Sequence, residues 1–402
     1  MADVSAAAPS RRGRLRATLR ESASVTPLEL FFDLVFVLAL TQCTALMAKE
    51  PTPAGIAKGL LVLGVLWWAW VGYAWLTSVV DPEEGIVRIA MFAAMAGLLV
   101  AALCVPEAFG ESAIVFAVAY GVVRFAQVWL LGMAGAEDPA LRRSVVTGLL
   151  GSTSLGVVLL VAAAFADGPL QGGLWALALA LDMAGPYLFG AEGWKLVPSH
   201  FAERHGLIVI IALGESIVAI GVGAEIGVDA GVVAAAVLGI AVAAAQWWLY
   251  FDVVALVAER KLSSAPVGRE QNEMARDSYS FLHLPMVAGI VLVALGMKKT
   301  LGDVDAPLKL VPAAALLGGT TAYLLAHVAF RWRNVHSLNR QRLAVAVALL
   351  ALLPVAVALP ALATVGLLAA VLVALIAYEA VRFAEARDRV RHELERGSAG
   401  SD

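Results

Sequence analysis

Long apolar stretches recur along this chain, and they limit its possible folds more than any other feature. About twelve stretches are each roughly 20 residues long, the length of a helix that crosses a bilayer. Of the 402 residues, 61% are hydrophobic and 15% are charged, whereas a soluble domain has about 25% charged residues. Backbone groups in lipid must bond to one another, so the sequence predicts an all-α, polytopic transmembrane helix bundle. The expected spans are 27–47, 56–80, 86–106, 112–133, 143–166, 171–190, 200–222, 230–257, 278–297, 307–330, 342–359 and 361–382.

The distribution of Lys and Arg predicts the orientation of these spans. With twelve spans and the N-terminus inside, 23 of the 29 basic residues fall on the inner side. This bias places both termini in the cytoplasm and the chain in the plasma membrane. The separation of the last two spans rests on Leu359 and Pro360, because a single kinked helix there would reduce the count to eleven.

The polar segments divide the chain into five parts. Residues 1–26 form a basic cytoplasmic segment, and 191–199 is a cytoplasmic linker between two sets of spans at 27–190 and 200–382. The charged tail, 383–402, is either a cytoplasmic extension of the last span or a helix that binds a surface or a partner. The two cysteines lie in apolar stretches and indicate neither a disulfide nor a metal cluster.

The two sets of spans resemble each other in sequence. The segment FFDLVFVLALTQ at 31–42 aligns with RHGLIVIIALGE at 204–215. Three further pairs follow in the same order: 66–70 with 246–250, 95–103 with 287–295, and 119–125 with 322–328. Six spans per set is an even number, so the sequence predicts two six-helix repeats in parallel orientation. Transporters built in this way bind their substrates near the bilayer midplane, between the repeats.

One acidic residue, Glu215, lies deep in a predicted span. It is about 12 residues from the start, or roughly 18 Å along a helix. An ionisable side chain at that depth costs on the order of 2.5–3.5 kcal/mol and indicates a functional site. The repeat aligns Glu215 with Gln42 and aligns Arg124, another deep residue, with His327.

A buried charge needs a partner of opposite charge. We therefore predict a polar cluster between the halves with an Arg124–carboxylate pair at its centre. Glu215 is the natural partner for Arg124, and Asp33 and Asp182 are the alternatives.

Two motifs resemble a known family. The first span begins with Thr26-Pro27-Leu28-Glu29-Leu30-Phe31-Phe32-Asp33-Leu34-Val35-Phe36-Val37. The seventh carries His200, Glu203-Arg204 and Leu213-Gly214-Glu215-Ser216. Together these motifs resemble the bacterial low-temperature-requirement A family of membrane proteins, over nearly the whole chain. The resemblance marks Glu29, Asp33, Glu203, Arg204, Gly214, Glu215 and Ser216 as motif positions. The family is named for growth in the cold, so the resemblance implies no catalytic or transport residue.

The acidic residues of the first span have structural and functional interpretations. Thr26, Pro27 and Glu29 form a capping-box pattern at a helix start. Asp33 lies one turn deeper on the same face. It is either an ion-pair partner of an arginine such as Arg88 or Arg204, or a group that handles protons or cations.

The remaining polar residues also leave alternatives open. Gly214 and Ser216 flank the acid, and small residues permit either close helix packing or a ligand site. His283 and His327 suit proton relay, or they are satisfied core histidines. A metal site built on His200, Glu203 and His205 is disfavoured, because the histidines do not have the i,i+4 spacing of a zinc helix.

The function that fits these features is transport. We expect a proton- or cation-coupled secondary transporter of a small solute. The alternative is a membrane sensor or scaffold linked to cold growth. An enzyme is not expected, because the sequence has no phosphate loop, nucleophile elbow or metal-ligand spacing. No cofactor, metal or nucleic-acid partner is expected, the lipid bilayer is the predicted partner, and the oligomeric state stays open.

Overall fold

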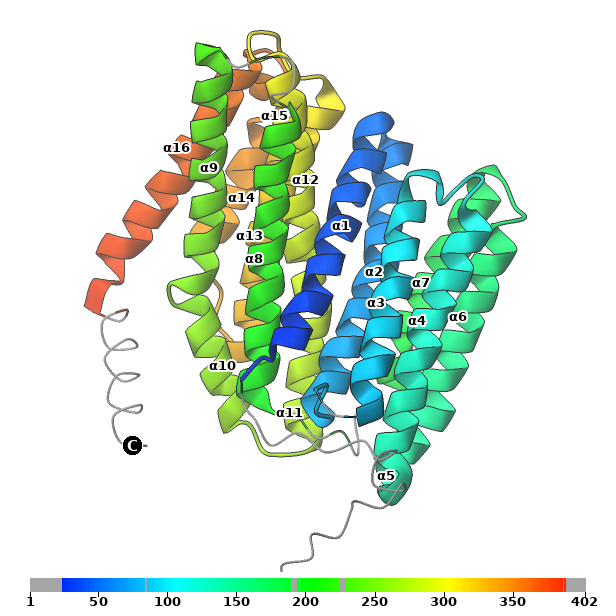
Figure 1. Cartoon of the computed structure of the whole chain (residues 1–402). Coiled ribbons are helices and arrows are strands. Elements are labelled where there is room, and N and C mark those ends of the chain that lie inside the picture. The colour runs from blue at the N-terminus through cyan, green and yellow to red at the C-terminus, as the bar shows by residue number, and fades with distance from the viewer. Residues whose placement is uncertain are drawn as a thin grey trace, which may run out of the picture.

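The computed structural model describes residues 24–385 except 84, 189–193, 195, 224–226 and 228, and it also describes 387. Of the predicted segment 1–26, linker 191–199 and tail 383–402, residues 1–23, 191–193, 195, 386 and 388–402 lie outside the described residues. The described residues form an all-α bundle (Figure 1). Its α-helices are α1 (Pro27–Lys49), α2 (Pro53–Val79), α3 (Gly85–Cys104), α4 (Ala113–Ala134), α5 (Pro139–Arg143), α6 (Leu150–Ala163), α7 (Gly168–Leu188), α8 (Pro198–Gly223), α9 (Ala230–Phe251), α10 (Val254–Ser264), α11 (Arg269–Met274), α12 (His283–Gly302), α13 (Leu310–Val335), α14 (Arg340–Ala351), α15 (Leu353–Ala356) and α16 (Ala361–Arg382).

Four short helices of other types complete the elements. Two are 3₁₀-helices, η2 (Val105–Glu107) and η3 (Gly135–Glu137), and two are π-helices, η4 (Ser144–Leu149) and η6 (Ala275–Phe281). A π-turn relieves local conflicts in a helix. Pro285 lacks an N–H and its ring would clash with the carbonyl four residues earlier, at Phe281. The π-helix η6 ends at Phe281, so it adapts the helix to Pro285.

The helices coincide with the predicted spans. Within the described residues, ten helical segments are long and apolar enough to cross a membrane. The predicted spans 171–190 and 342–359 correspond to α7 and to α14 with α15, which are not among those ten. The chain turns between Ala356 and Ala361, so α16 is a separate helix rather than the continuation of a kinked one.

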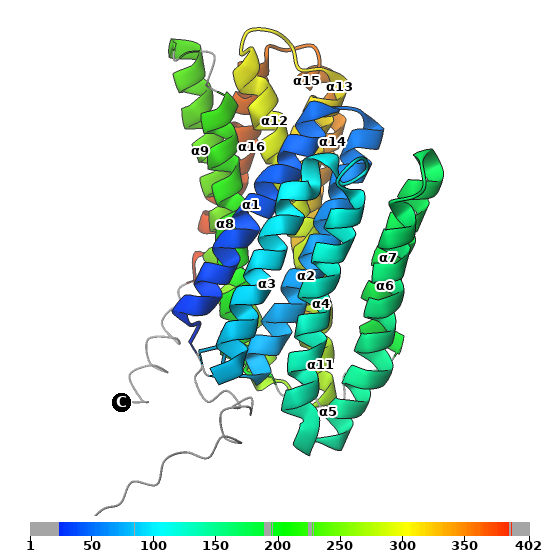
Figure 2. The same cartoon turned by 45° about the vertical axis from the view of Figure 1, so that its right-hand side comes forward.

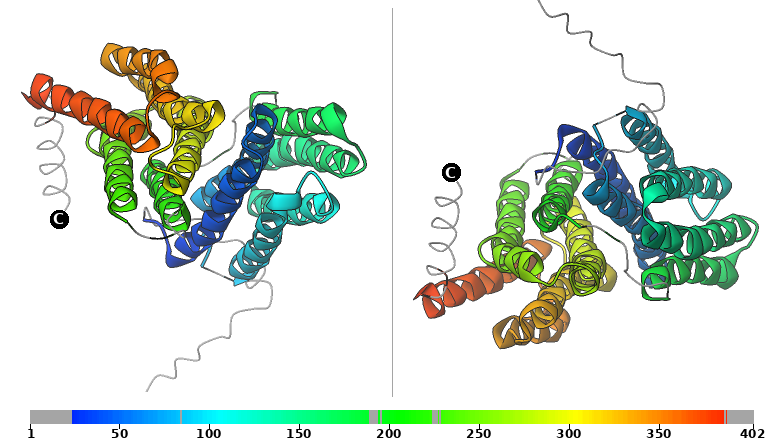
Figure 3. Two further views of the ribbon diagram at one scale, coloured as in Figure 1. Left: turned by 90° about the horizontal axis from the view of Figure 1, so that it is seen from above. Right: turned by 90° about the horizontal axis from the view of Figure 1, so that it is seen from below.

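The helices form two groups. Helices α1 to α7 lie on one side of the bundle and α8 to α16 on the other, and α1 lies at the boundary (Figure 3). In the first group α1 packs on α2 and α3, α3 on α4, α4 on α6, and α7 on both α6 and α2. In the second group α8 packs on α9 and α12, α12 on α13, α13 on α14, and α16 on both α14 and α9. The six helices of each group therefore meet in the same order.

Helices α1 and α2 join the two groups. Both pack against α8 and α12, whereas α6 and α7 lie at the outer edge of the first group (Figure 2). We call the contact between α1 and α8 the seam. The motif residues of the first and seventh predicted spans lie on α1 and α8, on either side of the seam. Arg124, Asp182, His283 and His327 lie on other helices.

Candidate functional site in the helix seam

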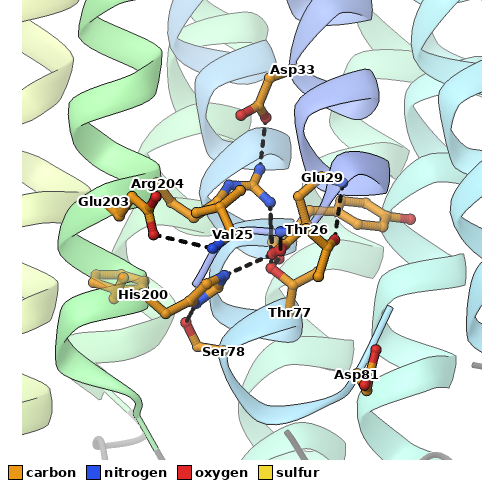
Figure 4. A network of polar contacts seen from close by, with 12 residues as sticks. Val25, Thr26, Glu29, Asp33, Thr77, Ser78, Asp81, His200, Glu203 and Arg204 are labelled. Carbon is orange, nitrogen blue, oxygen red and sulfur yellow. Dashed lines mark hydrogen bonds and ion pairs between the residues drawn. The ribbon is translucent and has the colours of Figure 1, made fainter. Parts of the chain in front are cut away.

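A compact set of polar side chains lies in the seam, near the end where α1 and α8 begin (Figure 4). We call it the seam cluster. All of its members are buried, with at most 2% of any residue exposed. They are Glu29 and Asp33 of α1, Trp70, Thr77 and Ser78 of α2, and His200 and Arg204 of α8.

Glu29 has two roles in the structure. The predicted capping box is confirmed, because the backbone N–H of Thr26 donates to Glu29 Oε2 and that of Glu29 donates to Thr26 Oγ1. The other carboxylate oxygen, Oε1, accepts from Arg204 Nη1 at 3.0 Å and lies 2.8 Å from His200 Nε2. One side chain therefore starts α1 and also binds α8.

Arg204 connects both acids of α1. Its Nη2 donates to Asp33 Oδ1 at 2.7 Å, and Trp70 Nε1 donates to the same oxygen at 2.8 Å. The guanidinium also lies over the Trp70 ring, 5.5 Å from its centre. Because Glu29 and Asp33 are four residues apart, one helix face presents both carboxylates to a single arginine. Of the two interpretations of Asp33, its pairing with Arg204 is thus present in the structure.

His200 closes the cluster from the other side. Its Nδ1 lies 3.0 Å from Ser78 Oγ, so its ring bridges α2 and α1. The neighbouring Glu203 is exposed and instead accepts from the backbone N–H of Val25 at 3.1 Å. No group of His, Cys, Asp and Glu in the described part of the chain could hold a metal ion.

The charges of the cluster are unequal. Among the side chains of the cluster itself, two carboxylates face one guanidinium, and a proton on His200 or on one of the acids would balance their charge. A buried group with net charge is costly in a low-dielectric interior. The arrangement can therefore hold a proton where the two helix groups meet.

Glu215 lies deeper in the same seam. It is 1% exposed, and Thr41 Oγ1 of α1 donates to its Oε2 at 2.5 Å. No ion pair of Glu215 is found within the described residues. The hydroxyl of buried Ser216 has no hydrogen-bond partner there, and Gln42 is half-buried beside Thr41. Gly214 is not a point of close helix approach, since a methyl group at this position would meet no atom within 4 Å.

Arg124 pairs with Asp182 and not with Glu215. Its Nη2 donates to Asp182 Oδ1 at 2.8 Å and to Thr153, and its Nη1 donates to Gln127. All of these residues belong to the first helix group. Our first choice of partner was wrong, because depth along two helices does not determine whether they are neighbours. Arg124 also lines a cavity of about 70 Å³ between α2, α4, α6 and α7.

The two histidines predicted as relay groups lie in the second helix group. His283 Nε2 is hydrogen-bonded to the Tyr250 hydroxyl at 2.8 Å, and its Nδ1 to the carbonyl of Ser278. His283 is thus a satisfied core histidine in this structure. His327 Nδ1 lies 3.1 Å from Arg342 Nη1, while its Nε2 has no partner within the described residues.

A further ion pair, largely buried, was not predicted from the sequence. Arg342 of α14 donates to both carboxylate oxygens of Glu379 on α16, at 3.0 and 2.9 Å. Both residues lie near the ends of apolar stretches, where a charge is inexpensive, so they did not stand out. Their positions near the ends of the predicted spans did not mark them as functional. The presence of one basic and one acidic residue on consecutive spans could have suggested an ion pair.

Comparison with known proteins identifies the family. The sequence profile described as "Bacterial low temperature requirement A protein (LtrA)" matches residues 24–377. A protein of Rhizobium meliloti (strain 1021), described only as uncharacterized, is 30% identical over 281 residues, which cover 67% of each chain. No solved structure matches. The profile covers both helix groups and the whole seam, so the chain belongs to the bacterial low temperature requirement A family and is a multi-pass membrane protein.

Proposed function

We propose that this protein is a proton- or cation-coupled secondary transporter of a small solute. The observation that carries the proposal is the row of buried ionisable groups along the seam. Charged residues inside a membrane are costly, and in transporters they mark the pathways of ions and substrates. Here they lie between two helix groups, where movement of one group against the other would change their contacts.

The proposal includes an internal repeat. The sequence alignment and the common packing order both support two six-helix repeats in parallel orientation, with the termini in the cytoplasm. In such transporters, one repeat rocks against the other around a site between them. The seam cluster would hold the repeats together at the end where α1 and α8 begin, and it would separate when that end opens.

Glu215 is the proposed coupling group. It faces the seam with the hydroxyls of Thr41 and Thr44 as its partners, and Lys298 of α12 acts on it electrostatically without forming an ion pair among the described residues. An ionised carboxylate that is buried without a directly bound cation is costly. Its charge would therefore change with access to water. Asp33 is the second candidate, because it shares one guanidinium with Glu29.

The proposal is tested by measuring solute-driven proton movement in proteoliposomes that contain a pH-sensitive dye. We expect a solute from a chemically diverse panel to dissipate an imposed pH gradient. Glu215→Gln should abolish this coupled flux, because the amide keeps the shape but cannot exchange a proton. The folded state is checked by gel filtration and thermal unfolding. Coupled flux that is unchanged in Glu215→Gln would exclude this mechanism.

A sensor or scaffold is the second candidate. It is favoured by the dense pairing of the seam cluster and by the position of Glu215, which lines neither the cavity beside Arg124 nor the cavity beside Arg342. The native thiol of Cys43 tests the choice, since it is fully buried on α1, two residues after Thr41, whose hydroxyl binds Glu215. In a Cys104→Ala background, a transporter should expose Cys43 to a water-soluble thiol reagent, whereas a static scaffold should not.

A further inference from the structure

We propose that a cavity in the second helix group binds a small organic anion with an apolar body. Binding of this anion does not depend on transport. Its assignment as the transported substrate rests on the proposed function. The cavity has a volume of about 320 Å³ and lies between α9, α10, α13, α14 and α16. It lies at the end of the bundle where α1 begins and α16 ends (Figure 1).

The walls of the cavity are suited to an organic molecule. Ligand sites in proteins are mostly apolar, occupy about 300–1,000 Å³ and contain a few polar groups that converge on the ligand. Here Trp248, Leu249, Phe330, Ile376 and Phe383 provide the apolar wall. The polar groups converge from α13, α14 and the end of α16.

His327 presents a donor that needs an acceptor. Its Nδ1 lies 3.1 Å from Arg342 Nη1, and an arginine can only donate. Nδ1 must therefore accept, and the single proton of the neutral ring is on Nε2. Both carboxylate oxygens of Glu379 accept hydrogen bonds from Arg342. They hold the arginine in place, and this fixes the tautomer of His327. The residue is 1% exposed and lines the cavity, yet its Nε2 has no partner within the described residues.

The charge around the cavity favours an anion. Arg331, Arg342 and Arg387 line it together with two acids, Asp252 and Glu379. Arg342 pairs with Glu379, and Arg387 pairs with Asp252 at 2.5 Å. Arg331 donates through Nε to the neutral Ser337, so one positive charge is in excess among these residues. A carboxylate would accept from His327 and neutralise this excess.

The first helix group has a related but smaller cavity. It lies mainly between α2, α4, η4, α6 and α7, and Trp194, Arg276 and Ser280 close it from the second half of the chain. Of these elements, α2, α4, α6 and α7 occupy the same places in the packing order as α9, α13, α14 and α16. An arginine–carboxylate pair accompanies each cavity: the buried pair Arg124–Asp182 in the first and the largely buried pair Arg342–Glu379 in the second. The cavity beside Arg124 has a volume of only about 70 Å³. The proposed anion therefore binds in the cavity beside Arg342.

Calorimetric titration of the purified full-length protein tests the proposal. The probes are benzoate and hexanoate, with benzamide as the neutral match and benzylamine as the cationic match of benzoate. We expect one or both carboxylates to bind and the amide and amine to bind at least tenfold more weakly. Failure of both carboxylates to bind, or equal binding of the three aromatic probes, would overturn the proposal.

Three variants show whether binding occurs in this cavity. His327→Phe keeps the ring but removes the donor, and it should weaken carboxylate binding about tenfold, as expected for one hydrogen bond to a charged group. Arg331→Gln, at an exposed position, should weaken binding without disturbing the core. Lys58→Gln, on the opposite helix group, should bind like the parent. Unchanged affinity in both cavity variants would overturn the site.

The anion could be a free carboxylate or the headgroup of an anionic lipid. Repeating the benzoate titration in nanodiscs separates these sources. Loss of binding in phosphatidylglycerol, with binding retained in phosphatidylcholine, would assign the site to the lipid headgroup. Binding in both would assign it to a soluble anion. The titration imposes no gradient, so it measures binding independently of transport. A protein that binds benzoate but moves no protons would contradict the proposed transport function and leave the binding site intact.

Discussion

At the scale of single residues, the seam cluster shows how one arginine can connect two helix groups. Arg204 forms ion pairs with both Glu29 and Asp33, and both acids are fully buried. Replacing an entire buried ion pair by apolar groups can be neutral, but removal of one partner leaves the other charge uncompensated. The cluster is therefore most sensitive at Arg204, which is shared.

Arg204→Met should destabilise the protein by about 3–5 kcal/mol, because two buried carboxylates lose their cation. Thermal unfolding in detergent measures the loss. Lys58→Met is a suitable control, since Lys58 forms a partly exposed ion pair with Glu50 at 3.4 Å and should change stability by less than about 1 kcal/mol. Equal effects of both variants would show that the cluster does not hold the seam.

For single residues, sequence spacing predicts contacts within one helix but not contacts between helices. The capping box at Glu29 and the shared face of Glu29 and Asp33 could be predicted, because both depend on spacing within one helix. The partner of Arg124 could not, because several acids lie deep in other spans and sequence spacing does not say which span is adjacent. Asp182 was one of three candidates, and only the packing of α4, α6 and α7 selects it.

At the scale of helices, hydropathy predicts where spans lie but not how closely they approach. Helices α12 and α13 come together at Gly289 and Gly319, where a methyl group on Gly319 would lie 2.6 Å from the carbonyl oxygen of Gly289. Small residues permit such contact between backbones in a membrane. From the sequence, Gly214 was a candidate for close helix packing, but it has no such contact. A glycine in a helix shows its role only when the neighbouring helix is known.

Gly319→Ala should destabilise the protein by about 1–3 kcal/mol, because α13 must move away from α12 to admit the methyl group. The adjacent Gly318 is a matched control on the same helix, since a methyl group there would meet no atom within 4 Å. Gly318→Ala should be neutral or slightly stabilising, as alanine favours helices by up to about 1 kcal/mol. Similar unfolding temperatures for the two variants would argue against close packing here.

At the scale of the whole molecule, the arrangement brings together features that are far apart in sequence. The two helix groups share a packing order, and each buries an arginine–carboxylate pair beside a cavity. The sequence predicted the spans and suggested the repeat, because hydropathy and internal similarity are properties of one chain. The cavities could not be predicted, since each depends on how four or more helices diverge at one end.

The orientation of the bundle in the membrane is a prediction from the distribution of Lys and Arg, and it can be tested directly. Val267 and Asp305 are exposed in loops at opposite ends of the segment that contains η6 and α12. Val267 lies on the side of the predicted spans that holds 23 of the 29 basic residues. This bias predicts that its loop faces the cytoplasm and that Asp305 faces outward.

In a background with Cys43→Ala and Cys104→Ala, a membrane-impermeant maleimide added to intact cells should therefore label Asp305→Cys. It should label Val267→Cys only after the membrane is permeabilised. The reverse pattern would invert the bundle and would place the anion cavity on the outer side. Labelling of both positions in intact cells would mean that α12 does not cross the membrane, which would contradict the two-repeat arrangement.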